Sequence, residues 1–177
     1  ELIAPFAEST VLSAQQRLDL SRVCRFPLTL RWRLAYRASR DGFSRDLMEA
    51  KSIYRHRTLT VVKTASGGGG GGHIFGGYKS RQNNSDVSAL YLCETGDELF
   101  MFSLSNAKHT PPARFDCRPD HELASADFYS FGNGDLTIAD KADQNADSVA
   151  HLGAYFHSPY PHESDQAKTF LAGAERF

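Results

Sequence analysis

The sequence predicts a mainly β fold of the α+β class, in which two antiparallel sheets pack as a sandwich with short helices at its side. Three observations support this class. Many short runs are rich in β-branched and aromatic residues, turn-forming residues separate most of them, and only two segments have helical spacing. The 177 residues are near the usual size of one domain and can bury one substantial core. We therefore predict a single domain over residues 1–177.

Two helices are predicted in the first third of the chain. Residues 13–24 have an apolar face, and Ser13 and Gln16 have the spacing of a capping box. A second short helix begins after Ser44, because serine is favoured at the position before the first helical residue.

Between these helices, residues 30–39 alternate between apolar and basic side chains. Such alternation is typical of a strand with one buried and one solvated face. The apolar face carries Trp32, Leu34 and Tyr36, and the basic face carries Arg31, Arg33 and Arg37.

The remaining strands follow at short intervals. A β-branched run at residues 57–64 precedes a short strand at 73–79. Residues 98–105 are apolar enough for a strand that is buried on both faces. Further candidate strands are residues 113–117, 135–139, 152–157 and 170–172.

Six consecutive glycines, Gly67 to Gly72, raise the question of phosphate binding. A phosphate-binding P-loop needs Lys and then Ser or Thr directly after its last glycine, at the start of a helix. Here strand-like residues 73–75 follow, so we interpret the run as a loose connection between two strands. Gly76 and Gly77 lie inside a strand pattern, which predicts a bulge or the close approach of another backbone.

The charge of the chain is nearly balanced, with a net value of −1, but it is unevenly spread. Residues 17–57 contain ten Arg and one Lys against four acids, whereas residues 116–177 contain four basic residues against eleven acids. This asymmetry either marks a docking surface or is neutralised within the fold. The arginine row is likewise either a solvated face or a candidate contact with a protein partner. We expect no nucleic-acid partner and no membrane insertion, because no recognised nucleic-acid module and no apolar run of ~20 residues is present.

No catalytic or ligand-binding pattern is evident in the sequence. Cys24, Cys93 and Cys117 are too few and too widely spaced for a disulfide framework or a zinc motif, which favours a reducing cytosolic setting. His157 and His162 lie five residues apart across two prolines, which is not a recognised metal pattern. We therefore predict no catalytic residue, no metal ligand and no cofactor. The alternative is a redox-active protein or enzyme that uses an exposed thiolate at Cys93 or Cys117.

An ordered set of motifs covers nearly the whole chain. It consists of WRLAYRASRDGFS (residues 32–44), TLTVVKT (58–64), HIFGGYKS (73–80), DELFMFSLSN (97–106), FGNGDLTIAD (131–140) and FLAG (170–173). In this order the set resembles the TLDc domain family of eukaryotic oxidation-resistance and nuclear-receptor-coactivator-like proteins. The resemblance implies the two-sheet sandwich predicted above. The motif positions that it assigns to the fold are Trp32, Gly42, Phe43, Gly76, Gly77, Phe102, Gly132, Gly134, Asp135 and Gly173.

The resemblance also implies a function. TLDc proteins are non-enzymatic interaction domains linked to protection against oxidative stress, and several bind and regulate the vacuolar proton-pumping ATPase. The implied partner is then a peripheral subunit of that pump at the cytosolic face of acidic organelles, with Arg31, Arg33 and Arg37 as candidate contacts. An alternative is a structural interaction module within a larger scaffold protein.

The chain departs from the family pattern in two places. Arg81, Gln82 and Asn83 stand where the family often has a Trp. The chain also stops at Phe177, where a closing strand of the type F-x-x-x-E-[IV]-E-[VF] would begin. The absence of that strand predicts an unpaired neighbouring strand, and with it lower stability or self-association.

Overall fold

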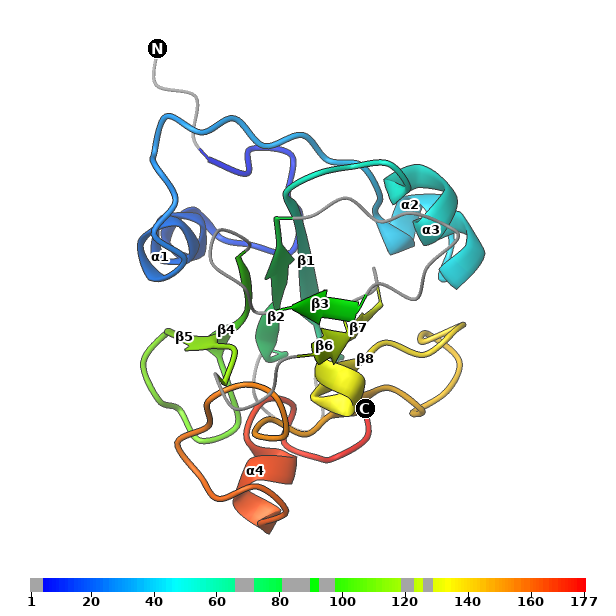
Figure 1. The fold of residues 1–177 in the computed structure, drawn as a ribbon. Helices are drawn as coiled ribbons and strands as arrows, with labels where there is room; N and C mark the ends of the chain where they lie inside the picture. Colours follow the sequence, from blue (N-terminus) through cyan, green and yellow to red (C-terminus); the bar gives the residue numbers. More distant parts are fainter. Residues whose placement is uncertain (1–4, 66–71, 81–89, 93–97, 119–122, 126–128) are drawn as a thin grey trace.

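A four-stranded antiparallel sheet runs through the middle of the molecule (Figure 1). The computed structural model describes residues 5–65, 72–80, 90–92, 98–118, 123–125 and 129–177. The central sheet has the strand order β1-β2-β4-β5. Its strands are β1 (Thr58–Lys63), β2 (Ile74–Lys79), β4 (Leu99–Ser105) and β5 (Ala113–Asp116). All four lie within segments that the sequence predicts as strands.

The predicted antiparallel pairing around the glycine run is confirmed. β1 and β2 pair with Val61 opposite Gly76, and the backbone N–H of Thr64 donates to the carbonyl of His73 at 3.0 Å. Most of the glycine run itself, residues 67–71, lies outside the described residues. The loop at residues 81–83, where the sequence departs from the family pattern, lies outside them as well.

A second, smaller antiparallel sheet has the strand order β7-β8-β9. It consists of β7 (Ser130–Phe131), β8 (Leu136–Thr137) and β9 (Val149–Ala150), with the 3₁₀ turn η1 (Gly132–Gly134) between the first two. Val149 also forms an antiparallel bridge with Arg176, so the last residues of the chain run beside β9. A separate pair is formed by β3 (Leu90–Leu92) and β6 (Leu123–Ser125). The predicted α+β class with two antiparallel sheets is therefore confirmed.

The described residues contain four helices, and two of them were predicted from their caps. They are α1 (Ala14–Val23), α2 (Ala38–Asp41), α3 (Arg45–Ser52) and α4 (Asp165–Thr169). At α1 both hydrogen bonds of the capping box between Ser13 and Gln16 are present. At α3 the Ser44 hydroxyl accepts from the backbone N–H of Leu47. None of the helices among these residues has the length and apolar character required to cross a bilayer.

The core consists of two hydrophobic clusters, one on each face of the central sheet. Alternation along β4 shows the division, because Met101 belongs to one cluster and Phe100 and Phe102 belong to the other. The first cluster packs the sheet against the C-terminal half of the chain, and the second packs it against the N-terminal half, including α1. β2 is buried along its whole length, as expected of a strand covered on both sides.

Four predicted strands were wrong in whole or in part. Residues 30–37 are extended but have no strand partner in the described part of the chain, and the segment ends in α2. The Leu34 N–H is directed at a Glu8 side-chain oxygen at 3.4 Å, and the Arg37 N–H donates to an Asp41 carboxylate oxygen at 2.9 Å. Side chains therefore occupy positions that a neighbouring strand would take. The alternation was real, since Trp32, Leu34 and Tyr36 are half-buried, while Arg31 and Arg33 are exposed.

The other three errors lie in the last third of the chain, after residue 130. Residues 152–157 form only an isolated bridge between Phe156 and Cys117, because the Asp135 carboxylate accepts three consecutive backbone N–H groups in this segment. Residues 170–172 continue the turn after α4, where the Gly173 N–H donates to the Thr169 carbonyl at 3.0 Å. The strand predicted at 135–139 is present only as β8.

Candidate functional site

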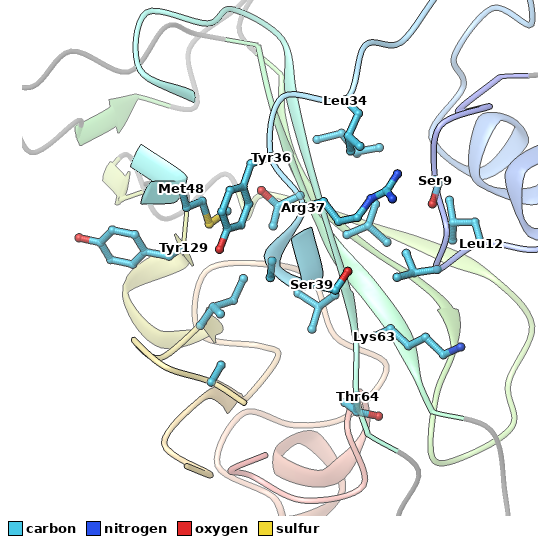
Figure 2. A pocket seen from close by; sticks show the side chains of 18 of the residues that line it. Ser9, Leu12, Leu34, Tyr36, Arg37, Ser39, Met48, Lys63, Thr64 and Tyr129 are labelled. Atoms are coloured by element: carbon cyan, nitrogen blue, oxygen red, sulfur yellow. The ribbon is translucent and has the colours of Figure 1, made fainter. Parts of the chain in front are cut away.

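A large groove runs along the outer edge of β1. One wall is β1 itself with Thr64, and the other is the extended segment of residues 30–37. Its volume is about 1940 Å³. Figure 2 shows Leu34 and Arg37 on the segment that runs beside β1, with Lys63 near the end of that strand. We call this feature the basic groove.

β1 is an edge strand, since its only strand partner among the described residues is β2. An edge strand presents a row of backbone N–H and C=O groups that can pair with another extended chain. The side chains of β1 between Thr58 and Val62 are half-buried. One wall of the basic groove therefore offers both hydrogen-bonding groups and apolar surface.

The basic groove carries a marked excess of positive charge. Eight Lys and Arg residues line it, against the two acids Glu8 and Asp143. Five of the eight are exposed and make no side-chain hydrogen bond or salt bridge within the described part of the chain. These five are Arg31, Arg33, Arg55, Arg57 and Lys63.

The other three cations of the groove are held by contacts within the domain. Arg37 donates to the Glu8 carbonyl at 2.6 Å. Arg45 donates to the Ile138 carbonyl at 3.0 Å, and its guanidinium lies 4.4 Å from the centre of the Tyr129 ring. These contacts tie the walls to the rest of the fold and fix the shape of the groove.

The third held cation, Lys51, belongs to a small cluster around Asp41. Its ammonium lies 2.9 Å from one Asp41 carboxylate oxygen, and the Arg40 guanidinium lies 2.8 Å from the other. Hydrogen bonds from Arg40, from the Arg37 backbone N–H and from Lys51 hold the pKa of Asp41 well below its usual range. The cluster joins α2 to the end of α3, next to the groove.

The candidate contacts named from the sequence all line this groove, but they differ in availability. Arg31 and Arg33 are exposed, whereas Arg37 is half-buried and engaged with Glu8. Sequence reasoning missed Arg55, Arg57 and Lys63 as members of the same surface. The signal for the first two was the basic excess of residues 17–57. Lys63 could be placed only once β1 was known to be an edge strand.

The predicted close approach of another backbone is present at Gly76, whereas at Gly77 the approaching group is a side chain. A Cβ atom at Gly76 would lie 1.9 Å from the backbone oxygen of Thr60 on β1. A Cβ atom at Gly77 would lie 2.4 Å from the ring of Phe131, which is fully buried. β2 also contains a register irregularity between Ile74 and Phe75. Both glycines therefore permit contacts that a side chain would prevent.

The other motif residues lie at the surface of the groove, in turns and in the core. Trp32 stacks on Phe6 with ring centres 5.0 Å apart, and Phe102 is fully buried. Phe43 is 40% exposed. Gly42, Gly132, Gly134 and Gly173 have positive φ angles of 98°, 64°, 125° and 83°.

Asp135 holds the turn that follows β9. Its carboxylate is buried and accepts the backbone N–H groups of Ala154, Tyr155 and Phe156 at 2.8, 2.8 and 2.9 Å. Burial raises the pKa of this carboxyl, although the three N–H donors oppose the shift. Asp135 thus fixes a loop that would otherwise leave three N–H groups without acceptors.

The two cysteines that the structure describes are in different states. Cys24 is a free thiol, 2% exposed, and burial raises its pKa to about 12. Cys117 is disulfide-bonded, so in this state it is not the free thiolate that the redox alternative considered. Cys93, the other candidate thiolate, lies outside the described residues.

Comparison with known proteins identifies the family. A family model described as the TLDc domain matches residues 6–177. No curated protein and no solved structure matched the chain. The match extends over nearly the whole sequence, including both walls of the basic groove and the turn that Asp135 holds. The chain therefore belongs to the TLDc domain family.

Proposed function

We propose that this domain is a non-enzymatic protein-interaction module whose partner docks in the basic groove. The observation that carries the proposal is the set of five exposed cations beside the edge strand β1, none of which makes a side-chain hydrogen bond or salt bridge to the described residues. Membership of the TLDc family supports the choice of partner class. The partner is a peripheral subunit of the vacuolar proton-pumping ATPase, and through that contact the domain takes part in protection against oxidative stress.

The groove favours an extended, acidic segment of that subunit. An extended chain can pair with the open edge of β1, and main-chain hydrogen bonds of this kind contribute affinity in known strand-addition complexes. Carboxylates on such a segment would pair with Arg31, Arg33 and the other free cations. Charge complementarity of this kind speeds association and excludes basic competitors.

The expected contribution of the free arginines can be estimated. An exposed ion pair contributes about 0.2–1 kcal/mol. Removing Arg31 and Arg33 together should therefore weaken binding by about 2- to 30-fold. The effect should shrink as salt is raised, because the screening length is about 8 Å at physiological ionic strength.

The experiment measures binding of the domain to purified peripheral subunits of the pump. It compares the wild type with the Arg31→Ala/Arg33→Ala variant. A matched control, Arg22→Ala/Arg25→Ala, removes the same charge from exposed residues outside the groove lining. Arg37 is left unchanged, because its contact with Glu8 would confound binding with stability.

We expect weaker binding for the groove variant and near wild-type binding for the control. Equal weakening in both variants would show that only net charge matters and would refute the role of the groove. If the wild type binds no peripheral subunit, the pump is not the partner.

A second candidate function is redox chemistry at Cys117, favoured by its disulfide. Redox titration with alkylation and mass spectrometry tests it. A regulatory disulfide should open at the potential of the cellular glutathione pool, whereas a structural one typically stays closed to below about −300 mV. Persistence of the Cys117 disulfide under such reducing conditions would refute this second function.

A further inference from the structure

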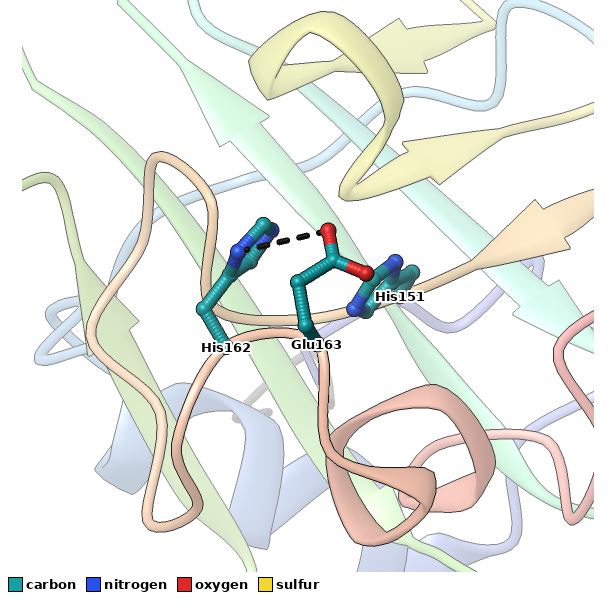
Figure 3. A group of neighbouring side chains, drawn as sticks. All are labelled: His151, His162 and Glu163. Atoms are coloured by element: carbon teal, nitrogen blue, oxygen red, sulfur yellow. Dashed lines mark ion pairs between the residues drawn. The ribbon is translucent and has the colours of Figure 1, made fainter.

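Two histidines and a glutamate lie close together in the loop region between β9 and α4 (Figure 3). His151 directly follows β9, and His162 and Glu163 lie in the loop before α4. Each offers one ligand atom, and these atoms all lie within 4.8 Å of one another. The imidazole rings are parallel, with centres 4.9 Å apart. The His162 Nδ1 atom lies 3.5 Å from a Glu163 carboxylate oxygen.

One atom of this cluster lacks a partner. The Nε2 atom of His151 is shielded from solvent and has no hydrogen bond to any of the described residues. Leaving a buried polar atom unsatisfied costs about 1–3 kcal/mol. Such atoms are rare in folded proteins, and an unseen ion is one of their recognised explanations. The nitrogen is therefore available to coordinate a ligand.

The fold brings the three residues together through the turn that Asp135 holds. The backbone N–H of His151 donates to the Asp135 carbonyl at 2.9 Å, while the Asp135 carboxylate holds residues 154–156. Gly153 lies between them at φ 123°, and a Cβ atom there would lie 3.6 Å from the Cα of His162. Residues 158–164 are thereby packed back over His151.

We propose that His151, His162 and Glu163 bind one zinc ion. Two imidazole nitrogens and one carboxylate oxygen form a known three-ligand set for zinc, with a fourth position left for water or a partner group. Tetrahedral bonds of about 2.0–2.2 Å place ligand atoms roughly 3.4 Å apart. The cluster therefore needs to contract by about an ångström. The rings must also tilt from their parallel arrangement, because a metal ion lies in the plane of each imidazole that binds it.

The exposure of two of the ligands permits this adjustment. His162 and Glu163 are both exposed, so their side chains can move without repacking the core. Lys168 carries a positive charge that opposes zinc binding, since its ammonium lies 3.6 Å from a Glu163 carboxylate oxygen. Zinc would replace that exposed ion pair, which contributes little on its own. The buried Asp135 carboxylate interacts electrostatically with His162, and its negative charge favours a cation at the cluster.

Sequence reasoning did not predict this site. It considered His157 and His162 and found no metal pattern, and it did not single out His151. The two histidines that meet in space are separated by ten residues, and only the loop geometry brings them into contact.

The test measures zinc binding to the chelator-treated protein by calorimetry, with Co²⁺ as a spectroscopic probe of the ligand geometry. The variants are His162→Gln and Glu163→Gln, both at exposed positions. The matched control is His157→Gln, because His157 is exposed on the same loop but outside the cluster. Circular dichroism confirms that each variant is folded.

We expect the wild type and His157→Gln to bind one zinc ion per chain, and Co²⁺ to give the visible absorption of a four-coordinate site. His162→Gln and Glu163→Gln should bind zinc at least tenfold more weakly, since even outer-shell partners of zinc ligands change affinity by about 10–100-fold. Absence of one-to-one binding by the wild type, or unchanged affinity in both cluster variants, would overturn the proposal.

Discussion

Replacing Asp135 by asparagine should destabilise the domain measurably. The carboxylate uses both oxygens to accept three backbone N–H groups, whereas an amide offers one oxygen. In its best orientation the amide oxygen serves Tyr155 and Phe156, and its NH₂ group then faces the N–H of Ala154. One buried N–H and one NH₂ group lose acceptors, at about 1–3 kcal/mol each. Burial raises the pKa of the Asp135 carboxyl, because the charged form is disfavoured away from water. Removing this buried charge therefore offsets part of the cost. We expect a net loss of about 2–3 kcal/mol in the free energy of unfolding.

Thermal unfolding followed by circular dichroism measures the effect. For a domain of this size each kcal/mol lowers the midpoint by about 2–4 °C, so Asp135→Asn should melt about 4–12 °C below the wild type. Asp147→Asn is the matched control, because Asp147 is exposed and its side chain forms a 3.6 Å ion pair with the exposed Arg176. Its unfolding free energy should change by no more than about 0.5 kcal/mol. If Asp135→Asn melts within 2 °C of the wild type, about the scale of a surface substitution, the turn does not depend on the carboxylate.

Three further predictions concern other parts of the fold. Gly77→Ala should lower the unfolding free energy by about 1–3 kcal/mol, because its Cβ would lie 2.4 Å from the Phe131 ring. The double variant Gly77→Ala/Phe131→Leu should lose less unfolding free energy, measured by denaturant titration, than the two single variants lose in sum. Strictly additive losses would contradict a contact between the two positions. Cys24 should resist alkylation at pH 8 until the protein unfolds, since burial raises its pKa to about 12, and rapid native labelling seen by mass spectrometry would disprove this. The pKa of Asp41 is lower in the folded state than in the unfolded state. The charged carboxylate therefore stabilises the fold at neutral pH, and this stabilisation is lost progressively as the pH falls from about 5 through the lowered folded pKa. The gap in thermal midpoint between the wild type and Asp41→Asn should therefore narrow from pH 7 to pH 3, and a constant gap would argue against the Asp41 cluster.

Local signals made most of the fold predictable. The capping residues Ser13 and Ser44 act on N–H groups three positions away, so short sequence patterns contain the whole interaction. The alternation at residues 30–37 correctly indicated which side chains are buried. It could not show whether the backbone has a strand partner, because that depends on Glu8 and Asp41.

The sites were predictable only in part. Arg31 and Arg33 were visible as a row, but the groove exists because β1 lies at the edge of the sheet beside them. The approach of His151 to His162 depends on a turn that Asp135 holds through backbone groups. No residue pattern encodes such contacts directly, since every residue type except proline offers the same backbone N–H donor at residues 154–156.

The position of the central sheet between two hydrophobic clusters has a consequence for partial unfolding. β2 and β4 contribute side chains to both clusters, whereas α1 packs against only one of them. The N-terminal layer can therefore detach while the other face of the sheet stays packed. Native-state hydrogen exchange should resolve such a sub-global opening, with the amides of α1 released at lower free energy than those of β2 and β4. The amides at the centre of the sheet then report the stability of the whole domain, and those of α1 report the attachment of one layer.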